Sequence, residues 1–205
     1  MKSYTIHFIR HGITEGNLKG QYIGSTDLPL CIEGEAQLQK MAQEIDYPGA
    51  GAFFISPMRR CIQTMDILYP DAKPIVMEGL RECDFGEFEG LTADQLRDMK
   101  EFREWIAAPH DYPPPNGESG EHFSQRICAA FEGIVTGLLK TGITSAVIIT
   151  HSGVIAALLS RYGIPEASPA EWICAPGTGF SARIHPRLWM TDQVMEVFAR
   201  TPEFS

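Results

Sequence analysis

The stretch that decides the fold is SYTIHFIRHGITEGN, residues 3–17. Its first half alternates β-forming residues and is largely apolar on both faces, which predicts a strand over residues 4–10 that is covered on both sides. This strand leads directly into Arg10, His11 and Gly12. A cation and an imidazole contribute little to packing there, but open α/β sheets bind ligands beyond the carboxyl ends of their strands. We therefore expect a ligand site at this edge of a sheet.

Strand and helix patterns alternate along the rest of the chain. The pattern predicts further strands at 52–56, 74–77, 145–150, 179–184 and 194–199. It predicts helices at about 33–45, after Ser56, after Thr92, at 119–140 and after His151. Ser56 is the expected N-cap of its helix, with Pro57 at the first helical position. The segment TADQ at 92–95 has the spacing of a capping box.

This alternation predicts the fold class. We expect an α/β protein, a three-layer sandwich in which a mostly parallel sheet is flanked by helices. The length of 205 residues suits one domain over 1–205. A mainly helical insertion is expected at about 79–144, over the C-terminal ends of the strands, where a site would lie.

Composition limits the class of function. The chain carries 26 acidic against 17 basic side chains, a net charge of −9, which argues against a nucleic-acid-binding surface. The five cysteines form no CxxC pair and are expected to be reduced thiols in a cytoplasmic protein. No signal peptide is predicted, and the longest apolar runs are too short to cross a membrane. The oligomeric state is left open by these patterns.

Basic side chains occupy equivalent places on several predicted elements. Arg10 and His11 end the first strand, His151 follows the strand at 145–150, and Arg60 falls in the first turn of a helix. A histidine after a strand is more often structural, and an arginine in a first turn is usually solvated. Here all of them reach one sheet edge, beside a helix N-terminus that favours phosphate. Because guanidinium groups match phosphate oxygens in pairs, the set predicts a site for a tetrahedral dianion.

Four motifs carry a family resemblance. They are RHG at 10–12, SPMRRCIQT at 56–64, LRECDFGEFEG at 80–90 and THSG at 150–153. In this order, and each on its expected element, they resemble the histidine phosphatase superfamily, also called phosphoglycerate mutase-like. The segment NGES at 116–119 is similar to the alpha-ribazole phosphatase-type branch of that family.

The resemblance implies roles for individual residues. His11 matches the histidine that accepts the phosphoryl group, and Glu82 matches the acid that protonates the leaving group. His151 matches a second histidine of the pocket, whereas Arg59 falls on a variable position. The residues that the resemblance implies in phosphate binding are Arg10, Arg60, His151 and Asn17.

The sequence departs from the family pattern near the pocket mouth. Ile13 stands where glutamate is usual, Gly16 where tryptophan is frequent, and Ser152 where glycine is common. None of these positions belongs to the set with implied catalytic roles. The shape of the pocket mouth is therefore the least predictable part of the site.

The residue types suit phosphoryl transfer without a metal. A histidine attacks phosphorus only as neutral imidazole, and neighbouring arginines disfavour the charged ring. We expect Asp84, Glu87 and Glu89 to raise the pKa of Glu82 by like charge, so that it can donate a proton. No metal-ligand spacing and no P-loop pattern appears, so neither a metal nor a cofactor is expected.

The sequence thus predicts a phosphomonoester phosphatase, a hydrolase that acts on a small phosphorylated metabolite through a phosphohistidine. Two alternatives stay open. A cofactor-dependent phosphoglycerate mutase would carry ERHYG where this chain has Glu82-Cys83-Asp84-Phe85-Gly86. A non-catalytic module that binds phosphorylated ligands would normally have lost His11 or Glu82.

Overall fold

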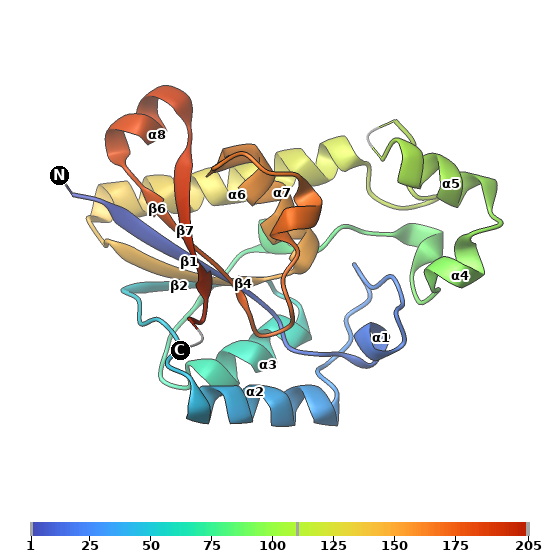
Figure 1. Cartoon of the computed structure of the whole chain (residues 1–205), viewed down its shortest axis with the longest axis horizontal. Coiled ribbons are helices and arrows are strands. Elements are labelled where there is room, and N and C mark those ends of the chain that lie inside the picture. The colour runs from blue at the N-terminus through green and yellow to red at the C-terminus, as the bar shows by residue number, and fades with distance from the viewer. Residues whose placement is uncertain (1, 110, 204–205) are drawn as a thin grey trace.

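A seven-stranded sheet forms the centre of the computed structural model, which describes residues 2–109 and 111–203 (Figure 1). The spatial order of the strands is β3-β2-β4-β1-β6-β7-β5. Their bounds are β1 Tyr4–Arg10, β2 Ala52–Ile55, β3 Ile75–Val76, β4 Ser145–Thr150, β5 Gly163–Ile164, β6 Gly179–Ile184 and β7 Met195–Thr201.

The pairing of the strands brings the predicted site elements together. β4 lies between β1 and β2 and is parallel to both, and β2 is parallel to β3. β6 is antiparallel to β1 and β7, whereas β5 and β7 are parallel. The prediction of a mostly parallel sheet is confirmed. The carboxyl ends of β1, β2 and β4 consequently share one edge.

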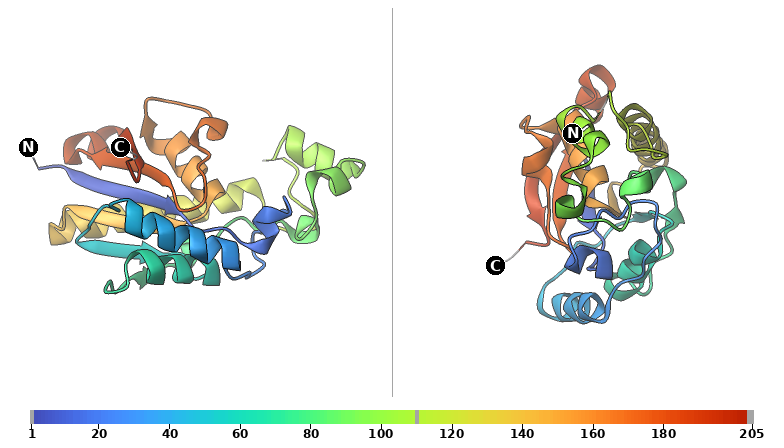
Figure 2. Two further views of the ribbon diagram at one scale, coloured as in Figure 1. Left: turned by 60° about the horizontal axis from the view of Figure 1, so that its bottom comes forward. Right: turned by 90° about the vertical axis from the view of Figure 1, so that its right-hand side faces the viewer.

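Helices cover both faces of the sheet. Figure 1 shows α2 and α3 below the sheet and α6 and α7 above it, and Figure 2 shows α2 and α6 on opposite sides of the sheet, which confirms the three-layer arrangement. Among the described residues, no helix combines the length and apolar character needed to cross a bilayer. The α-helices are α1 Glu15–Leu18, α2 Ile32–Glu44, α3 Arg59–Leu68, α4 Ala93–Leu96, α5 Lys100–Ala107, α6 Gly120–Thr141, α7 Ser152–Tyr162 and α8 Pro186–Asp192. The short 3₁₀ turns are η1 Glu78–Leu80, η2 Gly86–Phe88 and η3 Pro169–Trp172.

The two faces of β1 explain why it carries apolar residues on both sides. Ile6 and Phe8 face the core beneath α6 and α7, where Phe8 contacts the ring of Phe131. Ile9 points to the opposite face and belongs to the cluster that includes Leu38 of α2. A strand buried on both faces gains from apolar residues at successive positions, and it holds its final residues in a fixed place.

The segment between β3 and β4 is mainly helical, as the sequence predicts. It contains η1, η2, α4, α5 and α6, and residue 110 within it lies outside the described residues. Figure 1 shows α4 and α5 beyond the carboxyl end of β1. They pack around a separate small cluster of Phe88, Leu96 and Phe102. This group therefore stands next to the predicted site.

The prediction for the start of α3 is wrong. The helix begins at Arg59 with Met58 as its N-cap, so neither Ser56 nor Pro57 has the predicted position. The buried Ser56 hydroxyl lies 2.8 Å from Nε2 of His151 instead. A buried imidazole close by in the fold is a partner that local sequence patterns cannot reveal. The capping box at Thr92 is confirmed, although α4 ends after one turn.

Candidate active site

His11 is a buried, neutral imidazole with one free nitrogen. Its side chain is 5% exposed, and Nδ1 lies 2.7 Å from the Gly12 carbonyl oxygen. A carbonyl can only accept, so Nδ1 carries the proton and the lone pair of the neutral ring is on Nε2. Burial first, and then the charges of Arg60 and Arg10, hold the pKa of His11 well below its usual value. The ring is therefore in the form that a nucleophile requires.

Gly12 allows α2 to pack closely against the backbone beside His11. A Cβ at this position would lie 2.5 Å from Cδ1 of Leu38 on α2. Its N–H donates to Oγ1 of Thr64 on α3 at 2.9 Å. Both helices on that face of the sheet thus fix the backbone beside His11.

His151 faces His11 across the site. The ring centroids are 5.1 Å apart and the planes meet at 64°. Arg60 Nε donates to His151 Nδ1 at 3.2 Å, so the remaining ring proton is on Nε2 and points to Ser56 Oγ. Burial, followed by the charge of Arg60, lowers the pKa of His151 well below its usual value. Both histidines are consequently held neutral.

Two arginines supply the positive charge of the site. Arg60 is 1% exposed and also donates to the carbonyl oxygens of Thr26 and Gly24, at 2.9 and 2.8 Å. Arg10 Nη1 donates to the Cys174 carbonyl at 2.8 Å, whereas its buried Nε has no partner within the described residues. A buried donor without a partner is costly unless a ligand satisfies it. Arg59, by contrast, is exposed at the surface.

Glu82 reaches the same site from the loop after η1. Its carboxylate accepts the N–H of Cys83 at 3.1 Å and that of Gly153, at the start of α7, at 3.0 Å. Burial raises the pKa of Glu82, while these hydrogen bonds and then Arg60 and Arg10 oppose the rise. The net effect is a carboxyl group that holds a proton at higher pH than an ordinary glutamate.

The predicted cause of this pKa shift is wrong. Asp84, Glu87 and Glu89 do not raise the pKa of Glu82, because each is directed at other loop groups. Asp84 accepts the N–H of Gly86, and Glu87 accepts from the side chain of Asn116. Glu89 organises the pocket mouth by accepting backbone N–H groups of Gly24, Ser25, Thr26 and Phe85. Burial by the folded chain, and not like charge in the sequence, accounts for the direction of the shift.

Gly153 makes room for the Glu82 carboxylate. A Cβ at this position would lie 2.5 Å from Oε1 of Glu82. We expect Gly153→Ala to displace that carboxylate and to lower kcat for alkyl phosphates by at least about tenfold, a modest part of the usual contribution of general acid catalysis. Gly137→Ala is the matched control, since Gly137 lies within α6 and its Cβ would meet open space. Equal activity of the two variants in steady-state assays would contradict this role for Gly153.

Arg126 of α6, for which no sequence pattern predicts a role, fixes the backbone around Glu82. Arg126 of α6 donates to both carboxylate oxygens of Glu118, at 2.9 and 2.6 Å. The same guanidinium donates to the carbonyls of Gly79, Arg81 and Glu82, at 3.1, 2.9 and 3.3 Å. The three carbonyl partners are 44 to 47 residues away in the chain, so no local pattern could have indicated these contacts.

Asn17 is predicted to bind phosphate, but its side chain forms hydrogen bonds with the neighbouring Thr14. Its Oδ1 accepts from the N–H and the hydroxyl of Thr14, which forms a capping box at the start of α1. Among the described residues, no hydrogen bond joins Asn17 to His11, His151 or the two arginines. Its contact with phosphate therefore stays a prediction.

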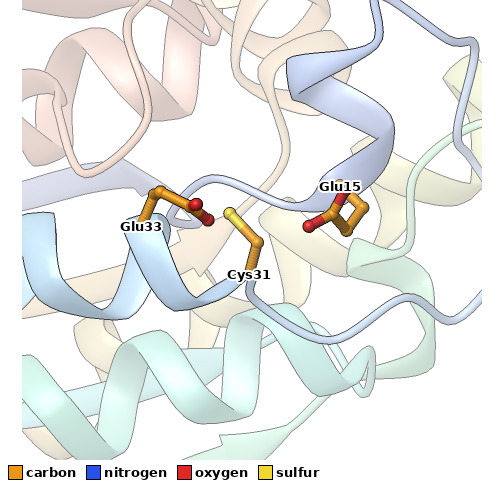
Figure 3. Close-up of side chains that lie close together, drawn as sticks. All are labelled: Glu15, Cys31 and Glu33. Carbon is orange, nitrogen blue, oxygen red and sulfur yellow. The ribbon is translucent and has the colours of Figure 1, made fainter.

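Glu15, Cys31 and Glu33 form the cluster with possible metal ligands, shown in Figure 3. Their ligand atoms lie within 4.8 Å of one another. The two carboxylates are exposed, and the Cys31 sulfur accepts the N–H of Gly34 as the N-cap of α2. Cys31 and Glu33 thus belong to the start of α2 and Glu15 to the start of α1, and the mechanism below does not use them.

Three of the five cysteines, Cys31, Cys61 and Cys174, are buried. All five lie within the described part of the chain and are free thiols. Burial raises the pKa of both Cys61 and Cys83 to about 12, so these thiols are protonated near neutral pH. Neither thiol is therefore in the thiolate form that a nucleophile requires.

Comparison with known proteins agrees with the fold. The model of the histidine phosphatase superfamily, branch 1, matches residues 6–185, and the chain belongs to this family. A 2,3-bisphosphoglycerate-dependent phosphoglycerate mutase from Cytophaga hutchinsonii is 28% identical, over 80% of this chain and 78% of its own. The adenosylcobalamin/alpha-ribazole phosphatase of Escherichia coli is 27% identical, over 80% of this chain and 81% of its own.

Solved structures show the same fold. The alpha-ribazole phosphatase from Shigella flexneri superimposes with a TM-score of 0.79, covering 95% of each chain at 23% identity. The family includes relatives named as phosphatases and relatives named as mutases. Sequence similarity of this degree establishes the family, and the chemistry of the individual site must be argued from its residues.

Proposed function

We propose that this protein is a metal-independent phosphomonoester phosphatase that acts through a phosphohistidine. The observation that carries the proposal is a pair of side chains that must be in opposite protonation states, an unprotonated nucleophile and a protonated acid. His11 is neutral with its lone pair on Nε2, and Glu82 has a raised pKa. One can attack phosphorus while the other donates a proton, which is the arrangement of an acid and a nucleophile in one site.

The reaction follows from these groups. Nε2 of His11 attacks the phosphorus atom, and the bond between phosphorus and the ester oxygen breaks. That oxygen takes the proton of Glu82 and leaves as an alcohol. Arg10 and Arg60 stabilise the charge that is spread over the phosphoryl oxygens in the transition state. His151 binds one of these oxygens if its Nε2–H exchanges Ser56 Oγ for that oxygen.

Water completes the cycle. Glu82, now a carboxylate, accepts a proton from a water molecule as its oxygen attacks the phosphohistidine. The bond between Nε2 and phosphorus breaks, inorganic phosphate is released, and the lone pair returns to His11. No step needs a metal ion, since the two arginines hold the phosphoryl group.

Release of inorganic phosphate from p-nitrophenyl phosphate in the presence of EDTA tests this function. We expect turnover in EDTA equal to that of the untreated protein. Transfer of the phosphoryl group to a second hydroxyl without release would indicate a mutase. Binding of a phosphomonoester with neither outcome would indicate a binding module, and either result would overturn the proposal.

A further inference from the structure

A cavity opens directly beside Glu82. Its volume is about 350 Å³, and its walls come from the loops around η1 and residues 116–118 and from the first turns of α6. Glu82 therefore belongs both to the phosphate site and to the lining of this cavity. An alcohol that receives the Glu82 proton is released beside this residue, and the cavity is the space that adjoins it. The residues that line the cavity are Ser25, Glu78, Arg81, Glu82, Asp84, Asn116, Gly117, Glu118, His122 and Arg126.

The cations in this lining already have acidic partners. Arg126 is committed to Glu118 and to backbone carbonyls, and the imidazole of His122 lies 2.9 Å from the same Glu118 carboxylate. Nη1 of Arg81 lies 3.8 Å from Oε2 of Glu78. Asp84 has no ion-pair partner within residues 2–109 and 111–203, and its Oδ1 accepts one backbone N–H. Even with Glu82 protonated, three carboxylates therefore face two guanidinium groups.

We propose that this cavity is the leaving-group site and that it selects phosphate esters without a second anionic group. The inference rests on the proposed phosphatase function. Carboxylate oxygens, the Ser25 hydroxyl and the backbone at 116–118 offer mainly acceptors, which suit hydroxyl or ammonium groups. A carboxylate or second phosphate would meet the uncompensated charge of Asp84. The substrate class is thus the monophosphate of a neutral or amino-bearing polar alcohol.

Matched pairs of esters test this selection through kcat/KM. Glycerol 3-phosphate and 3-phosphoglycerate differ only by a hydroxymethyl group against a carboxylate. Phosphoethanolamine and phosphoglycolate likewise differ by an ammonium group against a carboxylate. We expect the ester without the extra anion to be at least about tenfold better in each pair.

Variants show whether the charge in the cavity causes the discrimination between the two esters of a pair. Asp84→Asn keeps the oxygen that accepts the Gly86 N–H and removes the charge, so the discrimination within each pair should shrink severalfold. Glu121→Gln, on an exposed position of α6 outside the cavity, should leave the discrimination unchanged.

Two results would distinguish a failure of the charge selection from a failure of the proposed phosphatase function. If 3-phosphoglycerate is hydrolysed as well as glycerol 3-phosphate, or if Asp84→Asn does not alter their ratio, the charge selection is wrong while the phosphatase function stands. If no ester is hydrolysed, p-nitrophenyl phosphate included, the proposed function itself fails.

Discussion

Replacing His11 by alanine is expected to lower turnover of p-nitrophenyl phosphate by at least about 10⁴-fold, a typical loss when a nucleophile is removed. The folded state should persist, because His11 lies at the end of β1 and its Nδ1 contact is with the adjacent Gly12 carbonyl. The measurements are kcat, and the thermal unfolding midpoint by circular dichroism. A second test is chemical: protein quenched during turnover should carry an acid-labile phosphoryl group that His11→Ala lacks.

His7→Ala is a control from the same strand. His7 is an imidazole in the middle of β1, hydrogen-bonded through Nδ1 to Ser181 at 2.8 Å, and it lies away from the carboxyl edge. This variant should lose some stability and keep its kcat. An acid-stable phosphoserine on trapped protein, or equal activity of His11→Ala and His7→Ala, would contradict the phosphohistidine route.

Replacing Glu82 by glutamine is expected to slow alkyl phosphates by about 10²–10⁴-fold, the usual contribution of general acid catalysis. p-Nitrophenyl phosphate should be slowed much less, because p-nitrophenolate leaves without a proton. Glutamine keeps one of the two oxygens that accept the Cys83 and Gly153 N–H groups, so the side chain stays in place. Steady-state kinetics of both variants with both classes of ester measures the difference.

The pH profile provides an independent readout. Activity requires a neutral His11, which exists above its lowered pKa, and a protonated Glu82, which exists below its raised pKa. The two shifts therefore widen the pH window in which both forms occur together. The rate should follow a bell whose alkaline limb is lost in Glu82→Gln while the acid limb remains.

Glu87→Gln serves as the control from the same loop, since the Glu87 side chain is exposed and bonds Asn116. It should keep both limbs of the bell. A loss of equal size for the two leaving groups in Glu82→Gln would mean that Glu82 positions phosphate or water. Glu87 and Glu89, in the same loop, would then be the next carboxylates to test as the proton donor.

The architecture and the central part of the site follow from local sequence. Apolar residues at successive positions of β1 and β4 require a strand buried on both faces, and parallel pairing then brings Arg10, His11 and His151 to one edge. The position of Arg60 also follows from its place at the start of α3, although the predicted first residue of that helix is wrong. These inferences succeed because periodicity and connection rules act between residues near one another in the chain.

Other features were decided only by tertiary structure. The Ser56 hydroxyl is bonded to His151 instead of capping α3, and Arg126 holds the backbone around Glu82 from more than 40 residues away. The direction of the Glu82 pKa shift was predicted, but its cause was burial and not the neighbouring acids. The sequence by itself determined which chemical groups reach the sheet edge. Their hydrogen-bond partners, their burial and the charge balance of the cavity depend on distant segments that meet only when the chain has folded, and desolvation and hydrogen bonding act through that proximity in space.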